Sequence, residues 1–507
     1  MKLSQLIEGS GCFSLHPTTH PDERSEEGSR RVLRDMRLKD FEVKGIACDS
    51  RKVLDNYVFV AIKGEREDGN KFIEQAVNRG AKAVVVQCTV YSVHCTEKVN
   101  FIAVKNTRKA LARLAAEFYG NPSKKIKVVG ITGTNGKTTI SYLIENILKK
   151  AKASPAVIGT INYRFKDVVI CAKNTTPGPV ELESLLSDMV REKINYCLME
   201  ASSHALSQGR VGGIDFHSAI FTNLTQDHLD YHKTLGNYFQ SKAGLFKNIP
   251  PHSFAVINND DKYGRRLTRL TKAKVITYGI HQKADVSAHG IKFSSSRTQF
   301  LLVHPKGELL LKTKLIGLYN VYNVLASFAW GLKEKIGLGI LTSSLQGFNY
   351  VPGRLERIKG SQDFSIFVDY AHTEDALKNV IQALRALPHK RIIVVFGCGG
   401  ERDKTKRPKM GYTVTELSDY AVITSDNPRS EDPYDIIKDI KAGIVKKNFC
   451  VVPERYAAIK KSLSIARQGD IVLVAGKGHE GYQVLKEKAI AFDDRKVIRE
   501  CLKSMNY

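Results

Sequence analysis

The sequence predicts an α/β protein of three domains, and three observations predict it. The chain has 507 residues, more than a single hydrophobic core usually serves. Continuous apolar runs recur along the chain, and each ends in a polar loop. Such runs are typical of buried parallel strands, and open α/β sheets bind ligands at the carboxyl ends of such strands. We expect a small α/β domain over 1–107, a central domain with a mostly parallel sheet over 108–351, and a C-terminal Rossmann-like domain over 352–507.

The first domain is predicted from short strands and one helix. EVKGIACDSRKV and NYVFVAIKGEREDG each have the pattern of a strand followed by a turn, FIEQAVNRGAKAVVVQ that of a helix and a strand, and NFIAV that of a further strand. Residues 15–38 are polar and dense in charge, which predicts a loop or loose insertion. The helix RKALARLAAEFYG then leads into the second domain.

Four strand-then-loop segments predict the central domain: KVVGITGTNGKTT, YCLMEASSHAL, SAIFTNLTQDHLDYH and SFAVINNDDKYG. Because parallel strands end at one edge of a sheet, four polar loops at four strand ends indicate one shared site. After VPGRLE the pattern restarts in FSIFVDYAHTEDAL, RIIVVFGCGGERDKTKRP, YAVITSDNPRS and DIVLVAGKGHEGYQ. The last four segments predict the third domain.

Composition narrows the class of protein. The hydrophobic share of 42% and the charged share of 26% are ordinary for a globular protein, and no apolar run is long enough to cross a membrane. The N-terminal stretch MKLSQLIEGSGCF lacks the apolar core of a signal peptide, so we expect a cytoplasmic protein. Nine scattered cysteines without a CxxC pair indicate reduced thiols.

The net charge of +26 predicts polyanionic partners. Nucleic acid is one such partner, and a substrate rich in phosphates and carboxylates is another. Basic residues are spread along the chain and do not alternate with aromatic residues as a single-strand binder requires. We therefore expect no nucleic-acid partner. The rival hypothesis, a basic P-loop protein that binds nucleic acid, predicts binding that weakens steeply with salt.

The segment GITGTNGKTT, residues 130–139, predicts a phosphate-binding loop between a strand and a helix. Backbone N–H groups and the helix dipole favour phosphate at such a helix start. Lys137 is placed to reach the terminal phosphates, and Thr138 offers a hydroxyl to Mg²⁺. The standard pattern has a glycine where this chain has Ile131, so only Gly133 and Gly136 of the loop remain.

Side chains suited to a metal follow the next two strands. Glu200 ends an apolar run, and His204 lies four residues on. His228 and Asp230 follow the run after that. Each histidine taken alone is better explained as a hydrogen-bonded structural residue, but their shared place beside a phosphate loop favours a Mg²⁺ site.

Ten segments occur in an order that resembles the Mur ligases of peptidoglycan synthesis, specifically the MurE branch, which adds the third residue of the stem peptide. They are GTNGKTT, MEASSHALSQGR, TNLTQDHLDYH, VINNDD, GLYNVYNVLAS, VPGRLE, VDYAHT, FGCGGERDKTKRP, DNPR and AGKGHE. The resemblance runs from about Gly45 to the C-terminus. It implies ATP-dependent amide-bond formation through an acyl phosphate, small-molecule substrates, Mg²⁺ and a monomer. The nucleotide-linked substrate would be UDP-N-acetylmuramoyl-L-alanyl-D-glutamate.

The resemblance also implies roles for individual residues. The ATP contacts would be Gly133, Thr134, Asn135, Gly136, Lys137, Thr138, Thr139, Asn320, Asn323, Arg354, Asp369 and His372. The UDP-linked substrate would contact Ser50, Asn174, Thr175, Thr176, Ser202, Gln208 and Arg210, with the GEREDG loop near its uridine. Mg²⁺ would be held by Thr138, Glu200, His228 and a carbamylated Lys242, and the catalytic set would be Lys137, Lys242, His228 and Glu200. Glu374 stands where the family usually has proline, which leaves only the shape of that turn in doubt.

The stretch SDNPRS resembles the amine-donor site of the branch that adds meso-diaminopimelate. A guanidinium recognises a carboxylate with two hydrogen bonds, and diaminopimelate differs from lysine by one distal carboxylate. The implied donor contacts are Arg402, Asp426, Asn427, Pro428, Arg429, Gly476 and Glu480. Two rival hypotheses keep the fold, one a ligase that adds lysine and the other a folylpolyglutamate-synthase-like ligase that adds glutamate. The DNPR sequence argues against both.

Overall fold

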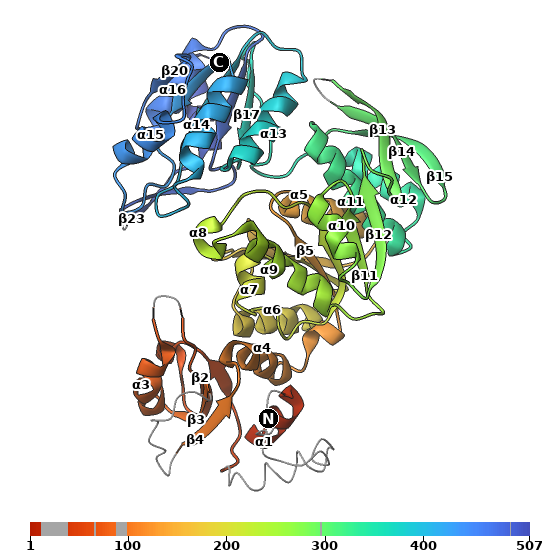
Figure 1. Ribbon diagram of the computed structural model, residues 1–507, viewed down its shortest axis with the longest axis vertical. Coiled ribbons are helices and arrows are strands. Elements are labelled where there is room, and N and C mark those ends of the chain that lie inside the picture. Colours follow the sequence, from red (N-terminus) through yellow and green to blue (C-terminus); the bar gives the residue numbers. More distant parts are fainter. Residues whose placement is uncertain (12–38, 65–66, 88–98, 295–296, 487, 507) are drawn as a thin grey trace. The chain divides into compact units, whose positions relative to one another are not determined.

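The computed structural model describes residues 1–11, 39–64, 67–87, 99–294, 297–486 and 488–506 (Figure 1). The insertion expected at 15–38 and residues 65–66 of the GEREDG loop lie outside these ranges. The chain divides into two compact units, each described by itself. The first comprises Met1–Val129, Ser154–Ile158 and Arg164–His217, and the second comprises Gly130–Ala153, Gly159–Tyr163 and Ser218–Tyr507. Within the described ranges, no helix combines the length and the apolar character needed to cross a membrane.

The first unit opens with a four-stranded parallel sheet, as the sequence predicts. Its strands, in spatial order, are β1 (Gly45–Ala47), β2 (Tyr57–Val60), β3 (Ala81–Gln87) and β4 (Asn100–Val104). Helices α1 (Leu3–Ser10) and α4 (Thr107–Phe118) pack on one face, and α3 (Ile73–Asn78) packs on the other. Side chains alternate between the two faces, so that Val58 lies with α1 and α4 and Phe59 with α3.

The remainder of the first unit carries a second strand pair. Strand β6 (Pro155–Ile158) is parallel to β9 (Tyr196–Glu200). Helix α6 (Pro179–Arg191) begins with Pro179, whose fixed φ suits the first helical turn. Helix α7 (Ser203–Ser207) follows β9 directly, and the Ser202 hydroxyl caps it by accepting from the Ala205 N–H at 3.2 Å. The unit also contains β8 (Val168–Cys171). Strands β5 (Lys127–Thr132), β7 (Asn162–Phe165) and β10 (Phe216–Phe221) contain residues of both units.

The second unit begins with the central strands that follow the phosphate loop. Strands β10, β11 (Phe254–Asn258), β12 (Lys274–Gly279) and β13 (Val286–Phe293) pair in parallel, and β14 (Thr298–His304) and β15 (Gly307–Thr313) extend this run antiparallel. The sequence analysis did not predict the antiparallel extension. The helices here are α5 (Lys137–Lys150), α8 (Leu229–His232), α9 (Leu235–Asn248), α10 (Lys262–Thr268), α11 (Leu318–Lys333) and α12 (Leu338–Gly347).

The C-terminal part of the second unit is a Rossmann-like layer structure. Its described six-stranded sheet has the order β16-β17-β21-β18-β19-β20, parallel except at β16. The strands are β16 (Glu356–Ile358), β17 (Ser365–Asp369), β18 (Ile392–Phe396), β19 (Tyr420–Ile423), β20 (Phe449–Val451) and β21 (Ile471–Ala475), with a hairpin of β22 (Tyr482–Leu485) and β23 (Lys488–Ala491).

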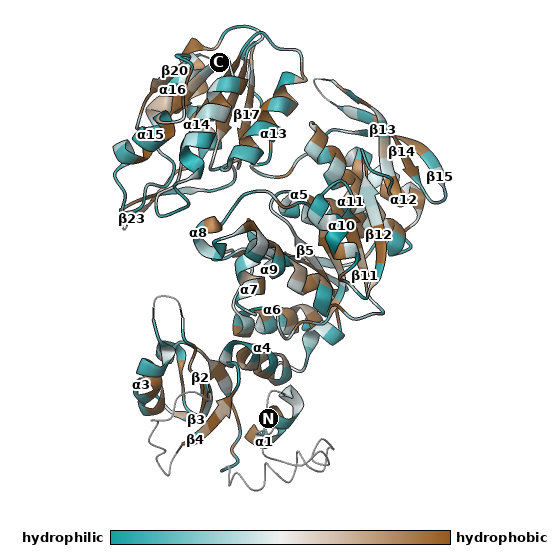
Figure 2. Cartoon of the chain, viewed as in Figure 1, coloured by the Kyte–Doolittle hydropathy of each residue, from teal (hydrophilic) through white to brown (hydrophobic). Residues whose placement is uncertain are grey.

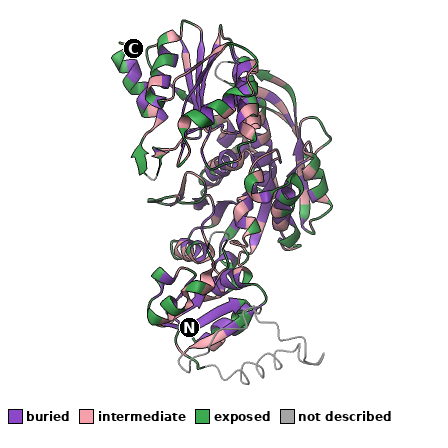
Figure 3. Cartoon of the chain, turned by 60° about the vertical axis from the view of Figure 1, so that its left-hand side comes forward, coloured by how far each residue is buried: buried purple, intermediate pink, exposed green. Residues whose placement is uncertain are grey.

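Helices cover both faces of this sheet. One hydrophobic cluster joins it to α13 (Glu374–Arg385), α14 (Lys406–Leu417) and α15 (Pro433–Lys441), and a second joins it to α16 (Arg455–Ile465) and α17 (Asp494–Ser504). Figure 2 shows hydrophobic colours along the strands, and Figure 3 shows the strands buried between the helices. Because β17, β18, β19 and β21 are parallel, their carboxyl ends share an edge. The loops with His372, Arg402, Arg429 and Glu480 begin there.

Candidate functional site

The phosphate loop is built around two glycines with positive φ. Gly133 has φ 149° and Gly136 has φ 91°, a region that favours glycine. A Cβ on Gly133 would clash with the hydroxyl of Thr222, and a Cβ on Gly136 would lie 2.5 Å from Oδ1 of Asn323. The backbone therefore runs close to its neighbours. Helix α5 begins at Lys137, directly after Gly136, so the N–H groups of its first turn lie beside the loop.

The loop after β10 holds the phosphate loop in place. The Asn135 N–H donates to Oδ1 of Asn223 at 3.0 Å, and the Thr222 hydroxyl donates to the Asn135 carbonyl at 2.6 Å. The strand end of β11 joins them, because Asn258 donates to the Thr222 carbonyl at 2.8 Å. Three of the four loops that the sequence predicted to share a site therefore meet within the second unit. Glu200, at the end of β9, belongs to the first unit.

Two lysines converge on the carbonyls of the phosphate loop. Lys137 donates to the carbonyls of Gly133 at 3.0 Å and Thr134 at 2.8 Å. Lys242 on α9 is 1% exposed and also donates to the Gly133 carbonyl, at 2.9 Å. Its ammonium lies 4.5 Å from the centre of the Tyr238 ring. Burial and the neighbouring charge of Lys137 lower the pKa of Lys242 well below its ordinary value, although Asp227 opposes this.

His228 and Asp227 form a pair at the start of α8. His228 has φ 54°, and its Nε2 lies 3.4 Å from Oδ2 of Asp227. Burial acts to raise the pKa of Asp227, but the charges of His228, His372 and Lys406 outweigh it and lower that pKa. His228 was predicted from the TQDHLDYH segment, but Asp227 of the same segment was not. Asp230, which was also considered for the metal, is exposed.

The predicted ATP-contact residues outside the loop also lie near it. Asn323 faces Gly136 from the second turn of α11, and its amide donates to Oδ1 of Asn320 at 3.0 Å. Arg354 donates to the Thr138 hydroxyl at 3.3 Å, and its guanidinium lies 4.5 Å from the centre of the Tyr370 ring. The structure thus places these side chains around the start of α5.

Asp369 is the last residue of β17, and His372 lies in the loop that follows it. Asp369 accepts from the N–H groups of Leu355 at 2.6 Å and Ala371 at 2.8 Å. Burial raises the pKa of Asp369, although Arg354 and those two N–H groups act to lower it. His372 Nδ1 lies 2.9 Å from the Tyr370 carbonyl, and burial together with Lys406 lowers the pKa of His372.

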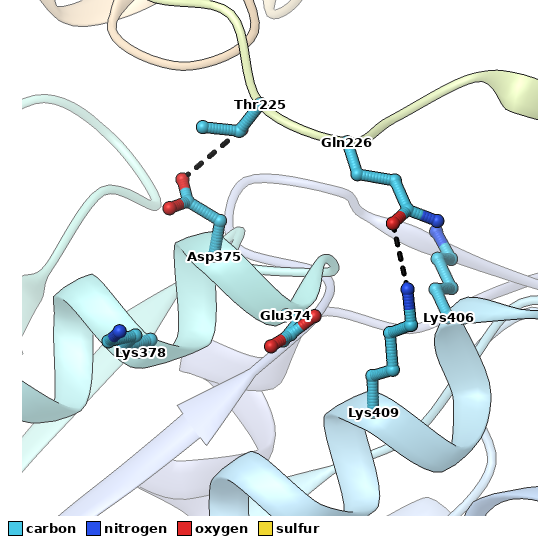
Figure 4. Close-up of a pocket in the computed structure, with 7 residues that line it drawn as sticks. All are labelled: Thr225, Gln226, Glu374, Asp375, Lys378, Lys406 and Lys409. Atoms are coloured by element: carbon cyan, nitrogen blue, oxygen red, sulfur yellow. Dashed lines mark hydrogen bonds between the residues drawn. The ribbon is translucent and has the colours of Figure 1, made fainter. Parts of the chain in front are cut away.

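A carboxylate that the sequence analysis missed links the phosphate loop to α13. Asp375 accepts from the amide of Asn135 at 2.8 Å and from the hydroxyl of Thr225 at 3.3 Å. Beside it is a pocket of about 230 Å³, shown in Figure 4. The pocket is lined by Thr225, Gln226, Glu374, Asp375, Lys378, Lys406 and Lys409. Lys409 donates to Gln226 at 2.8 Å across it. The sequence carries no specific signal for Asp375, because an aspartate at a helix start is common.

Two charged groups mark the loops at the edge of the C-terminal sheet. Arg429 has φ 55° and donates to the Gly400 carbonyl at 2.6 Å. A Cβ on Gly399 would lie 3.1 Å from the Arg429 guanidinium and 3.8 Å from Cγ of Arg402, so the two predicted arginines flank one glycine. The structure therefore brings Arg402 and Arg429 together at one place.

The second group is acidic and lies around Asn427. The Asn427 amide donates to Oε2 of Glu480 at 3.0 Å. Gly476 has φ 113°, and a Cβ there would lie 2.8 Å from Oδ2 of Asp426. Lys477 is fully buried among these side chains, and the sequence analysis missed it although it lies between Gly476 and Glu480 in AGKGHE. A guanidinium pair and a carboxylate pair on adjacent loops can bind the carboxylate and the ammonium of an amino acid.

The first unit gathers a third set of predicted residues. The buried Thr176 hydroxyl donates to the Glu200 carbonyl at 2.7 Å and accepts from the Ser202 N–H at 3.1 Å. Arg210 donates to the Thr176 carbonyl at 2.9 Å and to Oε1 of Gln208 at 2.7 and 2.9 Å. Asn174 and Thr175 directly precede Thr176 in the chain.

Ser50 lies elsewhere in the first unit, at a turn after β1. Its hydroxyl donates to Oε1 of Gln75 at 2.5 Å. The contact of Ser50 with the uridine stays a prediction.

The donor set around the phosphate loop suits a hard cation only in part. Among the described residues, no group of three or more His, Cys, Asp or Glu side chains is arranged to hold a metal ion. The Thr138 hydroxyl at the start of α5 is the kind of oxygen donor that Mg²⁺ takes together with phosphate oxygens. The Thr138 hydroxyl therefore fits a cation that arrives with a nucleotide.

Three family models match the chain. They are described as Mur ligase family, catalytic domain (residues 42–119), Mur ligase middle domain (131–331) and Mur ligase, glutamate ligase domain (353–478). The second and third matches fall within the predicted central and C-terminal domains, and the first runs from the predicted N-terminal domain across the boundary at residue 107.

Curated proteins and a solved structure are similar over almost the whole chain. A UDP-N-acetylmuramoyl-L-alanyl-D-glutamate--2,6-diaminopimelate ligase of Clostridium tetani is 44% identical over 92% of this chain and 96% of its own. The ligase of the same name from Geobacillus thermodenitrificans is 42% identical over 99% of each chain. A solved structure with that ligase name is 31% identical, covers 94% of this chain and 99% of its own, and superposes with a TM-score of 0.65.

Proposed function

Because this chain belongs to the Mur ligase family, we propose that it joins meso-diaminopimelate to UDP-N-acetylmuramoyl-L-alanyl-D-glutamate. It is an ATP-dependent amide ligase of peptidoglycan precursor synthesis. The observation that supports this donor best is the pairing of Arg402 and Arg429 at the edge of the C-terminal sheet, beside the carboxylates of Asp426 and Glu480. That arrangement matches a donor with a carboxylate and an ammonium at its distal end.

The reaction has two steps. The glutamyl carboxylate of the UDP-linked substrate attacks the γ-phosphorus of ATP, the bond from that phosphorus to ADP breaks, and an acyl phosphate forms. The donor amine then attacks the acyl carbon, phosphate leaves, and the nitrogen loses a proton. Phosphoryl transfer depends mainly on positioning and charge neutralisation, which the lysines and the N–H groups of the phosphate loop supply.

We assign the ATP contacts to the loop Gly133–Thr139 and to its neighbours. Lys137 already points its ammonium at the loop. The further contacts would be Asn320, Asn323, Arg354, Asp369 and His372. The proposed role of Arg354 follows from its hydrogen bond to Thr138, which places a guanidinium beside the start of α5. Asp227 and Asp375 join this list as positioning residues.

Mg²⁺ would neutralise charge on the transferred phosphoryl group, with Thr138, Glu200 and His228 as its contacts. Lys242 would complete this set as a carbamate. A buried amine that stays neutral can add CO₂, and Lys242 is buried beside Lys137 on the same loop carbonyl. Mass spectrometry of the intact protein in bicarbonate buffer, with Lys242→Arg as the control, tests the modification. A variant that loses turnover and regains it with added short carboxylates would support an anionic role for this side chain.

The UDP-linked substrate would bind the first unit. Thr176, Ser202, Gln208 and Arg210 form one hydrogen-bonded cluster that we assign to the sugar-peptide portion, with Asn174 and Thr175 beside it. Ser50 would contact the uridine in the N-terminal domain. We place the domain boundaries at 1–107, 108–351 and 352–507 and expect a cytoplasmic monomer that does not bind nucleic acid.

Amino-acid-dependent ADP release tests the proposed function. Purified protein with ATP, Mg²⁺ and the UDP-linked dipeptide should release ADP at a rate that rises with meso-diaminopimelate. L-lysine and L-glutamate serve as the rival donors, and a gel shift with DNA and RNA tests the nucleic-acid hypothesis. Faster turnover with lysine or glutamate than with diaminopimelate would overturn the choice of donor. No ADP release with any donor would overturn the activity itself.

A further inference from the structure

Lys477 is a buried cation to which the reaction described above gives no role. It is the second residue after β21, and its side chain is 0% exposed. The ammonium donates to Oδ1 of Asn427 at 2.8 Å and to the Tyr482 carbonyl at 2.8 Å. Lysine rarely lies so deep in a protein unless its charge is paired. Its partners therefore indicate why it is there.

Two carboxylates lie beside this ammonium. Nζ of Lys477 is 3.4 Å from Oε2 of Glu480 and 3.6 Å from Oδ1 of Asp426. With both acids ionised, two negative charges and one positive charge give the cluster a net charge of −1. The nearby guanidinium of Arg455 does not alter this balance, because it is already paired with the buried Asp494 at 2.7 Å. The cluster can therefore accept one further positive charge, such as an ammonium of the amine donor.

Lys477 also decides which way the Asn427 amide points. Oδ1 of Asn427 accepts from Lys477 at 2.8 Å and from the Val484 N–H at 2.9 Å. A flipped amide would turn its NH₂ group toward these two donors, which would break both hydrogen bonds. The Asn427 nitrogen is thus directed to Glu480, at 3.0 Å from Oε2. One lysine fixes both the charge of the cluster and the orientation of its amide.

We propose that Lys477 is a positioning residue of the amine-donor site, an internal counter-ion that keeps Glu480 ionised and Asn427 correctly oriented for the donor ammonium. This inference rests on the proposed function, because it concerns how that donor is held. Lys477 would act through Glu480 and Asn427 and need not touch the donor.

The surroundings of Glu480 give the inference a pH signature. Glu480 is influenced by Asp426, Lys477, Tyr370 and Arg455. Burial and the charge of Asp426 raise the pKa of Glu480, and Lys477 and the Asn427 amide act to lower it. Removal of the Lys477 charge would therefore raise this pKa further. Glu480 would then be neutral over a wider range, and donor binding would fail at a higher pH than in the wild-type enzyme.

Steady-state kinetics of Lys477→Met across the pH range of activity tests the inference. We expect the apparent KM for meso-diaminopimelate to rise about tenfold or more, an effect of about 1.4 kcal/mol. The KM for ATP should change little, and the acidic limb of kcat/KM for the donor should move to higher pH. The matched control is Lys488→Met, which removes an exposed positive charge from β23. This strand pairs with β22, whose Tyr482 carbonyl accepts from Lys477.

A second pair of variants separates charge balance from folding. Asp426→Asn combined with Lys477→Met restores the wild-type net charge of −1, so its acidic limb should return from that of Lys477→Met toward that of the wild type. If circular dichroism shows that Lys477→Met alone does not fold, the double variant still tests the charge balance. A Lys477→Met enzyme with the KM and pH profile of Lys488→Met would overturn the inference. Wild-type enzyme that does not use diaminopimelate would instead overturn the proposed function.

Discussion

Arg429 is the residue whose backbone and side chain are both unusual. Its φ of 55° is rare for a residue with a Cβ, and strain of this kind is common at functional sites. Backbone hydrogen bonds hold it there, since its N–H donates to the Val484 carbonyl at 3.2 Å and its carbonyl accepts from the Lys486 N–H at 2.7 Å. The fold thus holds Arg429 at the edge of the sheet in a backbone conformation that is unfavourable for an arginine by itself.

Arg429→Ala should impair use of meso-diaminopimelate much more than use of ATP. The distal carboxylate of the bound donor would then lack its charged partner, at a cost of about 1–3 kcal/mol. This cost is a loss of roughly ten- to hundred-fold in kcat/KM for the donor. Initial rates with varied donor and varied ATP measure the two effects separately. Arg499→Ala, at an exposed position of α17, is the control. Equal losses for both substrates would contradict a role in donor recognition.

The sequence identified side chains better than it identified their partners. Lys137, Arg429 and Glu480 could be selected because motifs fix their places in the chain. Asp375 and Lys477 could not, because a helix-start aspartate and a lysine between glycines have ordinary patterns. Their roles depend on contacts with Asn135 and Asn427, which are distant in the sequence.

At the scale of elements, the phosphate loop depends on the loop after β10. Thr222 and Asn223 hydrogen-bond to Asn135, so the glycine-rich backbone keeps its shape through a second strand end. The sequence predicted the parallel strands correctly, because apolar runs followed by glycine or polar residues are a strong signal. It did not predict β13, β14 and β15, which are buried on one face only and lack the fully buried pattern of the parallel strands.

Gly136→Ala should damage both stability and ATP use. The φ of 91° strains any residue with a side chain, and the new Cβ would lie 2.5 Å from Asn323. We expect a loss of about 1–3 kcal/mol and a raised KM for ATP. Gly244→Ala in α9, where a Cβ meets no atom within 4 Å, is the control and should not destabilise the protein. Urea unfolding with and without ATP measures both effects, and matching behaviour of the two variants would be the contrary result.

The junction of α16 and α17 carries a buried ion pair. Arg455 and Asp494 are both 0% exposed and lie 2.7 Å apart, and Arg455 also donates to the carbonyls of Ser425 and Ala475. These carbonyls directly precede Asp426 and Gly476. Through these two hydrogen bonds, the pair holds the starts of the two donor-site loops in place.

Asp494→Ala should destabilise the C-terminal domain strongly. Removal of one partner of a buried pair leaves an uncompensated charge, at a cost of about 3–5 kcal/mol. Combining it with Arg455→Met should recover much of the loss, because no charge is then stranded. Urea unfolding followed by circular dichroism measures the three proteins. An Asp494→Ala variant as stable as the wild type would show that solvent reaches Arg455.

At the scale of the whole molecule, stability is tied to pH through a buried acid. Glu183 on α6 is 2% exposed, and its Oε2 has no hydrogen-bond partner. Burial raises the pKa of Glu183 from 4.5 to about 8. The protonated form therefore suits the folded chain, and its contribution to stability is complete below pH 4.5 and lost as the pH rises to about 8.

Glu183→Gln should remove this pH dependence. The stability of the variant relative to the wild type should increase as the pH rises from about 4.5 to about 8, because glutamine carries no charge to bury. Urea midpoints of both proteins at several pH values across this range measure the difference. Glu192→Gln, at an exposed site just beyond α6, is the control. Parallel curves for the wild type and Glu183→Gln would mean that Glu183 is ionised in the folded protein.

The hairpin β22–β23 holds the main chain at position 429 through backbone hydrogen bonds, whereas the Arg429 side chain donates elsewhere, to the Gly400 carbonyl. The backbone that positions residue 429 is therefore separable from the side chain proposed to contact the donor. A laboratory library confined to positions 402 and 429 would vary the chemistry offered to incoming nucleophiles while the supporting backbone stayed the same. The C-terminal domain is therefore a starting point for engineering peptide couplings with unnatural amines.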